Sequence, residues 1–451
     1  MVNLNEVTIL NSVLINLQTT KEKPNFYNPH HHRNVKHPTS NFETFIHFLK
    51  VCIGIGVLAM PSAFRNAGYV VGTLGTLITG FICTYTLHLA FQTSYELCKK
   101  KKVPSLTYSA CVAAAFEEGP QLTRKFAPFA EFIVNFFLVL SLIGSNCVYI
   151  VFISTNIKSV VDNHFTNSID VKMFMIYLII PITLICCIRN LKFLIPLSSV
   201  ANCLSLLSFG IIFYYVFRDV PSLSSREPVG TIKNIPLFFG TALFAMVSIG
   251  MIFPLENEMK NPEGFCSVFG VINCAMLFIT ILFTFVGFFG YLKYGETNNG
   301  IITLDLPANE VLPQLMKLML SISIYSCYSL CNHVSIDIIW KHFETKMEKN
   351  EYKIWWEYTL RLSLVLLTFF LAVVVPNLEY LISFIGAFCS TMGIALPAII
   401  NLLTFLDVYR KQGCLRLSLF ILRNFLIVLI AIFAFIIGVS TCIKNIIAIQ
   451  E

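Results

Sequence analysis

Two apolar stretches of the sequence carry the same pattern of helix-breaking residues. Gly54-Ile55-Gly56 is followed by Pro61, and Ser248-Ile249-Gly250 is followed by Pro254. Glycine and proline weaken a helix. Lipid cannot satisfy the backbone groups that are freed, so unwound backbone at membrane depth is tolerated only where it is buried or lines a wet cavity. Simple kinks would use the same residues, but two breaks in matching positions favour a binding site.

The chemistry that such a site offers is the recognition of a zwitterion. Freed N–H groups at the start of a half-helix attract a carboxylate, and freed carbonyls accept from an ammonium group or bind a cation. The surroundings are small and apolar and hold no fixed counter-charge, which favours a small neutral ligand. We expect the site to be formed by both breaks and by two neighbouring helices, from Ile53, Gly54, Ile55, Gly56, Val57, Asn146, Tyr149, Phe244, Ala245, Met246, Ser248 and Ser329.

Ionisable groups that could couple binding to an ion are scarce. None of the 25 Asp and Glu residues lies at the middle of an apolar stretch, which argues against a carboxylate relay at the membrane midplane. His47 and Lys50 lie one turn apart on one face of a predicted helix, and an imidazole titrates near physiological pH. His47 and Lys50 are therefore the candidates for proton coupling. The alternative is a structural His47 with Lys50 extending to the interface. No cofactor and no metal site are predicted, and a proton is favoured over Na⁺.

A membrane is needed to position these residues. The chain has 451 residues, 56% of them hydrophobic and 13% charged, whereas soluble proteins average about 25% charged. This composition excludes a soluble enzyme or a nucleic-acid-binding protein. Because a helix needs about 20 apolar residues to cross the hydrocarbon, we predict an all-α polytopic membrane protein. Its eleven transmembrane helices are expected at 43–66, 69–97, 127–154, 171–188, 194–217, 235–254, 266–291, 310–339, 358–376, 380–405 and 418–443.

The distribution of Lys and Arg predicts the orientation. Of 32 such residues, 20 fall in the tail and connections of one side and 8 on the other side. Cytoplasmic loops carry the excess, so we expect a cytoplasmic N-terminus and an extracellular or luminal C-terminus. The histidines of the N-terminal tail are interpreted as solvated and not as metal ligands. The expected parts are a flexible cytoplasmic tail at 1–41, a transmembrane domain at 42–443 and a short tail at 444–451.

Several motifs follow one another along the chain. They are Thr44-Phe45-Ile46-His47-Phe48-Leu49-Lys50, Gly54-Ile55-Gly56, Pro61-Ser62-Ala63-Phe64, Phe239-Gly240-Thr241-Ala242, Pro254-Leu255-Glu256-Asn257-Glu258-Met259-Lys260-Asn261-Pro262, Pro376-Asn377-Leu378 and Gly386-Ala387-Phe388-Cys389-Ser390. In this order they resemble the proton-coupled amino acid transporters of the amino acid/auxin permease superfamily. The resemblance covers about residues 42–443. The Pro-Leu-Glu-Asn run after a broken helix is its most specific part.

The resemblance implies a LeuT-like fold. Such a fold has two inverted repeats of five helices, with helices 1 and 6 broken, and here one extra C-terminal helix follows. Helices 1, 2, 6 and 7 would then rock against helices 3, 4, 8 and 9. The sequence departs from the family at two places. Where the family commonly has Gly-Asn, this chain has Val51-Cys52, and where the family usually has Phe-Glu-Gly, it has Met246-Val247-Ser248. The second departure removes an acidic residue beside the site.

The expected function is secondary active transport of small neutral amino acids, driven by protons and working by alternating access, with no enzymatic activity. Three alternatives stay open: an uncoupled facilitator, a transporter-like amino acid sensor and a Na⁺-coupled carrier. The expected partners are small neutral amino acids and the lipid bilayer, without nucleic acid. The sequence leaves open the exact substrate, the choice between plasma and lysosomal membrane, and the oligomeric state.

Overall fold

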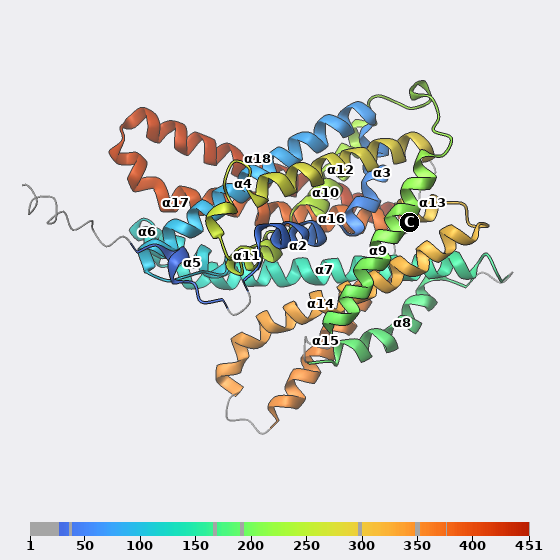
Figure 1. Cartoon of the computed structure of the whole chain (residues 1–451), viewed down its shortest axis with the longest axis horizontal. Coiled ribbons are helices and arrows are strands. Elements are labelled where there is room, and N and C mark those ends of the chain that lie inside the picture. Colours follow the sequence, from blue (N-terminus) through green and yellow to red (C-terminus); the bar gives the residue numbers. More distant parts are fainter. Residues whose placement is uncertain are drawn as a thin grey trace, which may run out of the picture.

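The computed structural model describes residues 27–35, 38–165, 169–189, 194–295, 300–347, 352–375 and 377–450. Within these ranges the chain is helical, and the one pairing of extended backbone is an isolated bridge between Thr39 and Met259. Long helices run alongside one another, with α5 and the start of the described chain at one end of the bundle and the C-terminus toward the other (Figure 1). We call the end that holds α5 the inner end.

Every range that the sequence predicts as a span is occupied by a helix or by a broken helix. The elements are α2 (Asn41–Cys52) with α3 (Ile55–Ala67), α4 (Tyr69–Lys101), α7 (Ala127–Val161), α8 (Val171–Cys186), α9 (Leu194–Phe217), α10 (Ile235–Met246) with α11 (Ile249–Asn257), α12 (Val271–Tyr294), α14 (Val311–Met347), α15 (Lys353–Val374), α16 (Leu378–Ser390) with a π-helix (Thr391–Ala395) and α17 (Leu396–Lys411), and α18 (Cys414–Gln450).

The predicted class, an all-α polytopic membrane protein, is confirmed. Within the described residues, eight helices are long and apolar enough to cross a membrane, or nine when the bent pair of α2 and α3 is taken as one span. Helix α8 is apolar but has only 16 residues, and α14 is long but is not among the eight helices that are apolar enough to cross. The number of eleven membrane-crossing helices therefore stays a prediction.

Local sequence signals explain where the first helices begin and turn. Ser40 and Glu43 form a capping box at the start of α2, in which the Ser40 Oγ accepts from the Glu43 N–H at 3.2 Å and the Ser40 N–H donates to Glu43 Oε2 at 2.7 Å. Between α3 and α4, Gly68 has φ +80°, and a Cβ there would lie 2.6 Å from the backbone N of Gly230. Only glycine allows this tight reversal.

Four segments differ from the expected connections and tails. The inner connection between α4 and α7 contains two short helices, α5 (Tyr108–Glu118) and α6 (Gln121–Arg124), and α18 extends through the residues expected to form the C-terminal tail. In the predicted flexible tail, the described residues form the 3₁₀-helix η1 (Pro29–His32) and dock against the bundle. Residues 1–26 and His37 lie outside the described part of the chain.

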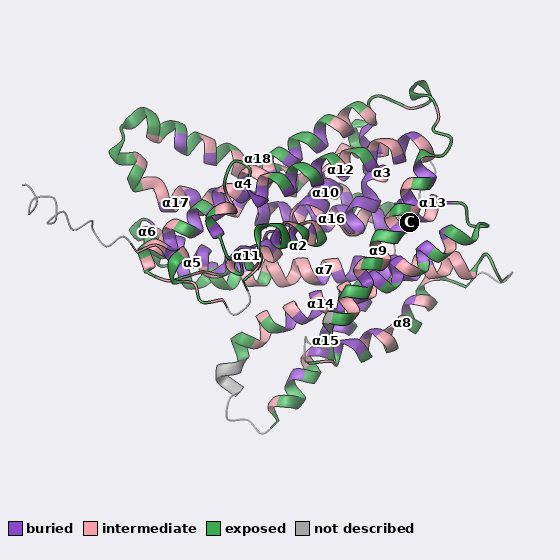
Figure 2. Cartoon of the chain, viewed as in Figure 1, coloured by how far each residue is buried: buried purple, intermediate pink, exposed green. Residues whose placement is uncertain are grey.

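The core is densest where α10 and α16 cross. Buried residues follow these two helices through the middle of the bundle, whereas α18 is largely exposed (Figure 2). A Cβ on Gly386 would lie 1.8 Å from the backbone oxygen of Gly240, and a Cβ on Gly240 would lie 2.2 Å from Ser383 Oγ. Small residues let two membrane helices approach closely, so these glycines fix the distance between spans 6 and 10.

The variant Gly386→Ala tests this packing. Its methyl group would force α10 and α16 apart, and overpacking of this kind costs about 1–3 kcal/mol of folding free energy. We expect the apparent Tm of the detergent-solubilised protein to fall by several degrees. Gly210→Ala is the matched control, because nothing lies within 4 Å of a Cβ at Gly210. An equal Tm for both variants would contradict the proposed role of the α10–α16 contact.

Candidate substrate site at the broken helices

The first break lies in the middle of span 1. Helix α2 ends at Cys52 and α3 starts at Ile55, and the two axes are bent by 52°. Ile53 and Gly54 between them have extended or irregular backbone, and a Cβ on Gly54 would meet nothing within 4 Å. The sequence predicted a break over Gly54-Ile55-Gly56, so the unwound part begins one residue earlier and is shorter than expected.

The second break interrupts span 6 at the corresponding place. Helix α10 ends at Met246, Val247 is extended with φ −94° and ψ 102°, and α11 begins after Ser248. The Val247 N–H still donates to the Leu243 carbonyl at 2.9 Å, which closes the last turn of α10. The predicted interruption of this span is therefore confirmed, and Ser248 lies within it.

The two breaks are neighbours in space. A Cβ on Gly56, in the first turn of α3, would lie 2.6 Å from the Cα of Ala245 in the last turn of α10. The Cys52 thiol at the end of α2 lies against the side chain of Ser248. Residues that are about 190 positions apart in sequence, roughly five spans, thus meet at a single place in the bundle.

Backbone groups are free at this meeting point. Neither Gly54 nor Ser248 caps the following helix with a side chain, so the first N–H groups of α3 and α11 have no helical partner. The N-terminal ends of these half-helices carry partial positive charge, and the carbonyl ends of α2 and α10 carry partial negative charge. A zwitterion finds complements for its carboxylate and its ammonium group here.

The predicted residues of the breaks lie together. Ile53, Gly54 and Ser248 are half-buried in the unwound segments. The others occupy the adjoining helical turns, with Phe244 half-buried and the rest buried, namely Ile55, Gly56, Val57, Ala245 and Met246.

The residues predicted from spans 3 and 8 lie on α7 and α14, which pack against each other. Leu138 of α7 lies over Gly250 of α11, and Asn146 follows about 12 Å further along α7. Both amide atoms of Asn146 are buried without a hydrogen-bond partner among the described residues. Unsatisfied buried amides are rare, so Asn146 is available to a ligand or water.

Tyr149 and Ser329 are engaged differently. The Tyr149 side chain interacts with Cys331 of α14. The Ser329 hydroxyl donates to the Ser326 carbonyl of its own helix at 2.9 Å. Ser329 therefore has a structural partner in this conformation, whereas the hydroxyl of Ser326 is buried and unpartnered among the described residues.

A π-helical segment at Thr391–Ala395 in span 10 was not predicted. Val247 packs into it, because a Cβ on Gly393 would lie 2.2 Å from Val247 Cγ1. The Tyr108 hydroxyl of α5 donates to the Met392 carbonyl at 2.5 Å. Short π-helical turns occur frequently at functional sites. Position 247, where the family that the sequence resembles commonly has Glu, therefore holds a valine whose side chain packs against Gly393.

His47 and Lys50 lie on the exposed face of α2. The Lys50 Nζ donates to the Ser198 hydroxyl of α9 at 3.4 Å, and Lys50 also interacts electrostatically with Cys327 of α14. Lys50 therefore links the inner half of span 1 to span 5. Among the described residues, no group of three His, Cys, Asp or Glu side chains could hold a metal ion.

An ion pair joins span 1 to span 10 at the outer end. The guanidinium of Arg65 in α3 donates to both carboxylate oxygens of Glu379 in α16, at 2.8 and 2.9 Å. The amide of Asn66 donates to the same carboxylate at 2.5 Å. Glu379 is buried and Arg65 is mostly buried. This contact therefore ties the outer half of span 1 to span 10.

Comparisons with known proteins match nearly the whole chain. A family model described as "Transmembrane amino acid transporter protein" matches residues 37–442. The "Proton-coupled amino acid transporter-like protein pathetic" of Drosophila melanogaster is 34% identical over 424 residues, covering 94% of this chain and 88% of that protein. The "Amino acid transporter AVT3C" of Arabidopsis thaliana is 27% identical over 399 residues, covering 84% and 86%.

A solved structure supports the fold. The structure described as "Inward facing conformation of Mhp1" is similar with a TM-score of 0.53 and 13% identity, and the match covers 93% of each chain. At this identity the likeness concerns the fold alone. The LeuT-like architecture with broken helices 1 and 6, predicted from the sequence, is confirmed.

The variant Glu379→Gln tests the outer ion pair. It leaves the Arg65 guanidinium without its carboxylate, and the loss of hydrogen bonds to a charged group costs about 1.5–3 kcal/mol. We expect a clear loss of thermal stability in detergent. Glu131→Gln serves as the control, since Glu131 is an exposed carboxylate on α7. If the two variants melted at the same temperature, the Arg65–Glu379 pair would not stabilise this conformation.

Proposed function

The chain belongs to the transmembrane amino acid transporter family, and on that premise we propose that it carries small neutral amino acids by proton-coupled symport. The observation that supports this most directly is the meeting of two unwound helices, with unpaired N–H groups on one side and carbonyls on the other. Because the relatives are named as transporters, the chain is a transporter and not an enzyme.

The preference for small neutral substrates rests on the lining of the site. No described carboxylate, lysine or arginine is among the residues of the two breaks, so a charged substrate side chain would lack a counter-charge. Gly56 and Ala245 are in contact, and the adjacent Phe244 and Met246 are bulky and apolar. A short apolar side chain fits these surroundings, whereas a long or ionised one is disfavoured.

Proton coupling is proposed through His47, with Lys50 as its neighbour. Val247 provides no acidic group beside the site, and it packs on Gly393. His47 lies in the inner half of span 1, one turn before a lysine that reaches span 5. A change of charge at His47 would therefore act on the half-helix that moves during alternating access. The absence of an acidic residue at position 247 favours uncoupled facilitation as the second candidate.

We further propose a cytoplasmic N-terminus and a C-terminus on the extracellular or luminal side, because the inner end collects the excess of Lys and Arg. The membrane is proposed to be the plasma membrane or the lysosomal membrane.

Uptake by purified protein in proteoliposomes tests the function. Radiolabelled alanine, glycine, proline, lysine and glutamate are compared at an outside pH of about 5.5 and about 7.5, with and without Na⁺. Proton symport of neutral amino acids predicts faster uptake of the small neutral members at low outside pH, independent of Na⁺. Exchange without dependence on the pH gradient would support a facilitator instead, and a requirement for Na⁺ would overturn proton coupling.

The variant Gly56→Val tests the site. The valine side chain would separate the breaks, because even a Cβ at position 56 would lie 2.6 Å from the Ala245 Cα of α10. Because a misplacement of about 1 Å at a binding site can cost about 100-fold in rate, we expect uptake to fall at least tenfold. Gly210→Val on the lipid-facing side of α9 is the control for expression and insertion. Normal uptake by Gly56→Val would remove the breaks as the substrate site.

The variant His47→Ala tests the coupling. If the imidazole carries the coupled proton, uptake should lose most of its dependence on outside pH between about 5.5 and 7.5, while binding of the substrate persists. His164, an exposed histidine at the outer end of α7, provides the control variant His164→Ala. An unchanged pH profile in His47→Ala would assign coupling to another group.

A further inference from the structure

The described residues before span 1 form a strap across the inner end of the bundle. We call residues 27–35 and 38–40 the inner strap. Its 3₁₀-helix starts with Asn28 as N-cap, whose side chain accepts from the His30 N–H at 3.1 Å. Its last residues pair with the segment after α11, where the Thr39 N–H donates to the Glu258 carbonyl and the Lys260 N–H donates to the Thr39 carbonyl, both at 2.9 Å.

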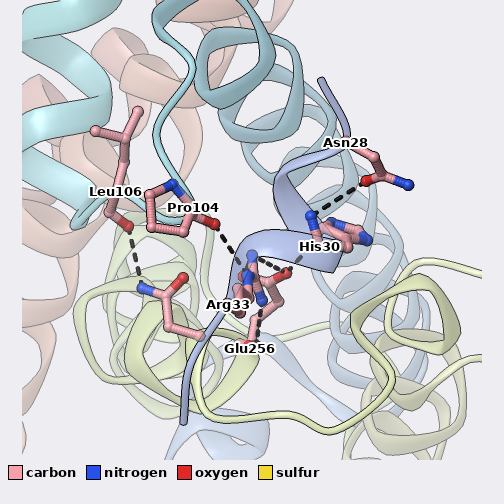
Figure 3. A network of polar contacts seen from close by, with 7 residues as sticks. Asn28, His30, Arg33, Pro104, Leu106 and Glu256 are labelled. Atoms are coloured by element: carbon pink, nitrogen blue, oxygen red, sulfur yellow. Dashed lines mark hydrogen bonds and ion pairs between the residues drawn. The ribbon is translucent and has the colours of Figure 1, made fainter. Parts of the chain in front are cut away.

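Arg33 is the central contact of the inner strap (Figure 3). Its Nη2 donates to both carboxylate oxygens of Glu256 in α11, at 2.8 and 3.0 Å, and its Nη1 donates to the Glu256 carbonyl at 2.9 Å. Both side chains are at most 10% exposed. Hydrogen bonds between an arginine and a carboxylate are charge-assisted and are among the stronger polar contacts in proteins.

His30 covers this ion pair. Its ring packs edge-on against Tyr95 of α4 and lies 4.0 Å from Glu256. Burial, with a smaller contribution from Arg33, lowers the pKa of His30 to about 4. The ring is therefore neutral near pH 7 and adds an aromatic cover without a competing charge. The inner strap thus contacts spans 2 and 6 together.

Two further hydrogen bonds reach the connection between α4 and α5. The Arg33 Nε donates to the Pro104 carbonyl at 3.1 Å, and the Asn257 amide at the end of α11 donates to the Leu106 carbonyl at 3.1 Å. Helix α5, which follows this connection, packs against α7 of span 3 and α17 of span 10. Helix α5 also touches α11 through Tyr108 and Phe253, but its main contacts are with helices that are not broken.

The inner halves of spans 1 and 6 are also tied to each other. Helices α2 and α11 are in contact, and the Thr39–Met259 bridge directly precedes the capping box that starts α2. The inner strap, α2 and α11 are consequently joined as one unit. Besides its apolar contacts with α4, α5 and α12, this unit is tied to the connection between α4 and α5 by the hydrogen bonds to the carbonyls of Pro104 and Leu106.

We propose that the inner strap is a lock: it holds the inner side of the carrier closed, and that side opens only when Arg33 and Asn257 leave the carbonyls of Pro104 and Leu106. This inference rests on the proposed transport function, because it assigns the lock to one step of alternating access. The lock acts on the unit that contains both inner half-helices, so its release frees both broken spans at once.

Native cysteines report on the lock. Cys266, in the loop after α11, and Cys98, in α4, line a cavity of about 320 Å³, and Pro29, His30 and Arg33 of the inner strap line the same cavity. All fifteen cysteines are free thiols. Burial raises the pKa of the Cys266 thiol to about 12, and because the thiolate is the reactive form, Cys266 reacts slowly while the strap is docked. Cys274, exposed near the start of α12, is an internal reference.

The experiment measures maleimide alkylation of each cysteine by mass spectrometry in lipid nanodiscs, where both faces of the protein are accessible. Arg33→Ala removes four hydrogen bonds to Glu256 and Pro104, and we expect the rate at Cys266, relative to Cys274, to rise at least tenfold. Asn257→Ala removes one neutral hydrogen bond and should raise that rate about threefold. Arg33→Lys keeps the charge but cannot make the contacts of Nε, Nη1 and Nη2 together, and its rate should lie between those of these variants.

Arg124→Ala is the matched control, because Arg124 is an exposed arginine of the same inner connection that donates only to the Gly119 carbonyl nearby. Unchanged alkylation in Arg124→Ala with faster alkylation in the strap variants supports the lock. Equal Cys266 rates in all variants, or equal acceleration by Arg124→Ala, would overturn it. If Arg33→Ala failed to fold, Arg33→Lys and Asn257→Ala would give the same decision. Alkylation needs no substrate, so failure of the lock is distinguishable from failure of the transport proposal.

Discussion

Lipid offers no hydrogen bonds to the backbone, and this constraint governs the structure. The segments at Ile53–Gly54 and at Val247–Ser248 cannot face hydrocarbon, because their free N–H and carbonyl groups would each cost several kcal/mol there. They are instead placed against each other and enclosed by the neighbouring spans. The contact of Gly56 with Ala245 brings them close, and we propose that the same free groups hold a zwitterion.

Polar contacts at the two ends of the bundle complement the breaks at its centre. At the outer end, Arg65 and Glu379 join α3 to α16. At the inner end, Arg33 and Glu256 join the inner strap to α11. Each pair connects a half-helix of a broken span to another part of the chain. In the proposed transport cycle, the hydrogen bonds that release the inner end are those of Arg33 and Asn257 to the carbonyls of Pro104 and Leu106, whereas the Arg33–Glu256 pair stays intact and the unwound segments act as joints.

Much of the fold could be predicted because it follows from hydropathy. The start of α4 at Tyr69 coincides with the predicted start, and breaks in spans 1 and 6 follow from their Gly and Pro residues. The exact unwound residues could not be predicted, because Gly56 was expected to lie in the break but belongs to α3. Its missing side chain instead allows close contact with Ala245. The π-helix in span 10 was also missed, since the Met392 carbonyl is satisfied by Tyr108, 284 residues away. Ser329 is a residue type that a binding site would use, but its hydroxyl donates to a carbonyl of its own helix.

We propose that a small neutral amino acid binds between the two breaks. Hydrogen–deuterium exchange of the protein in nanodiscs, with and without saturating alanine, tests this binding site directly. We expect slower exchange of the amides at 54–57 and 249–250 when alanine is present, and no comparable change at the exposed residues of α18. Unchanged exchange at both breaks, in protein that still takes up alanine, would place the substrate elsewhere.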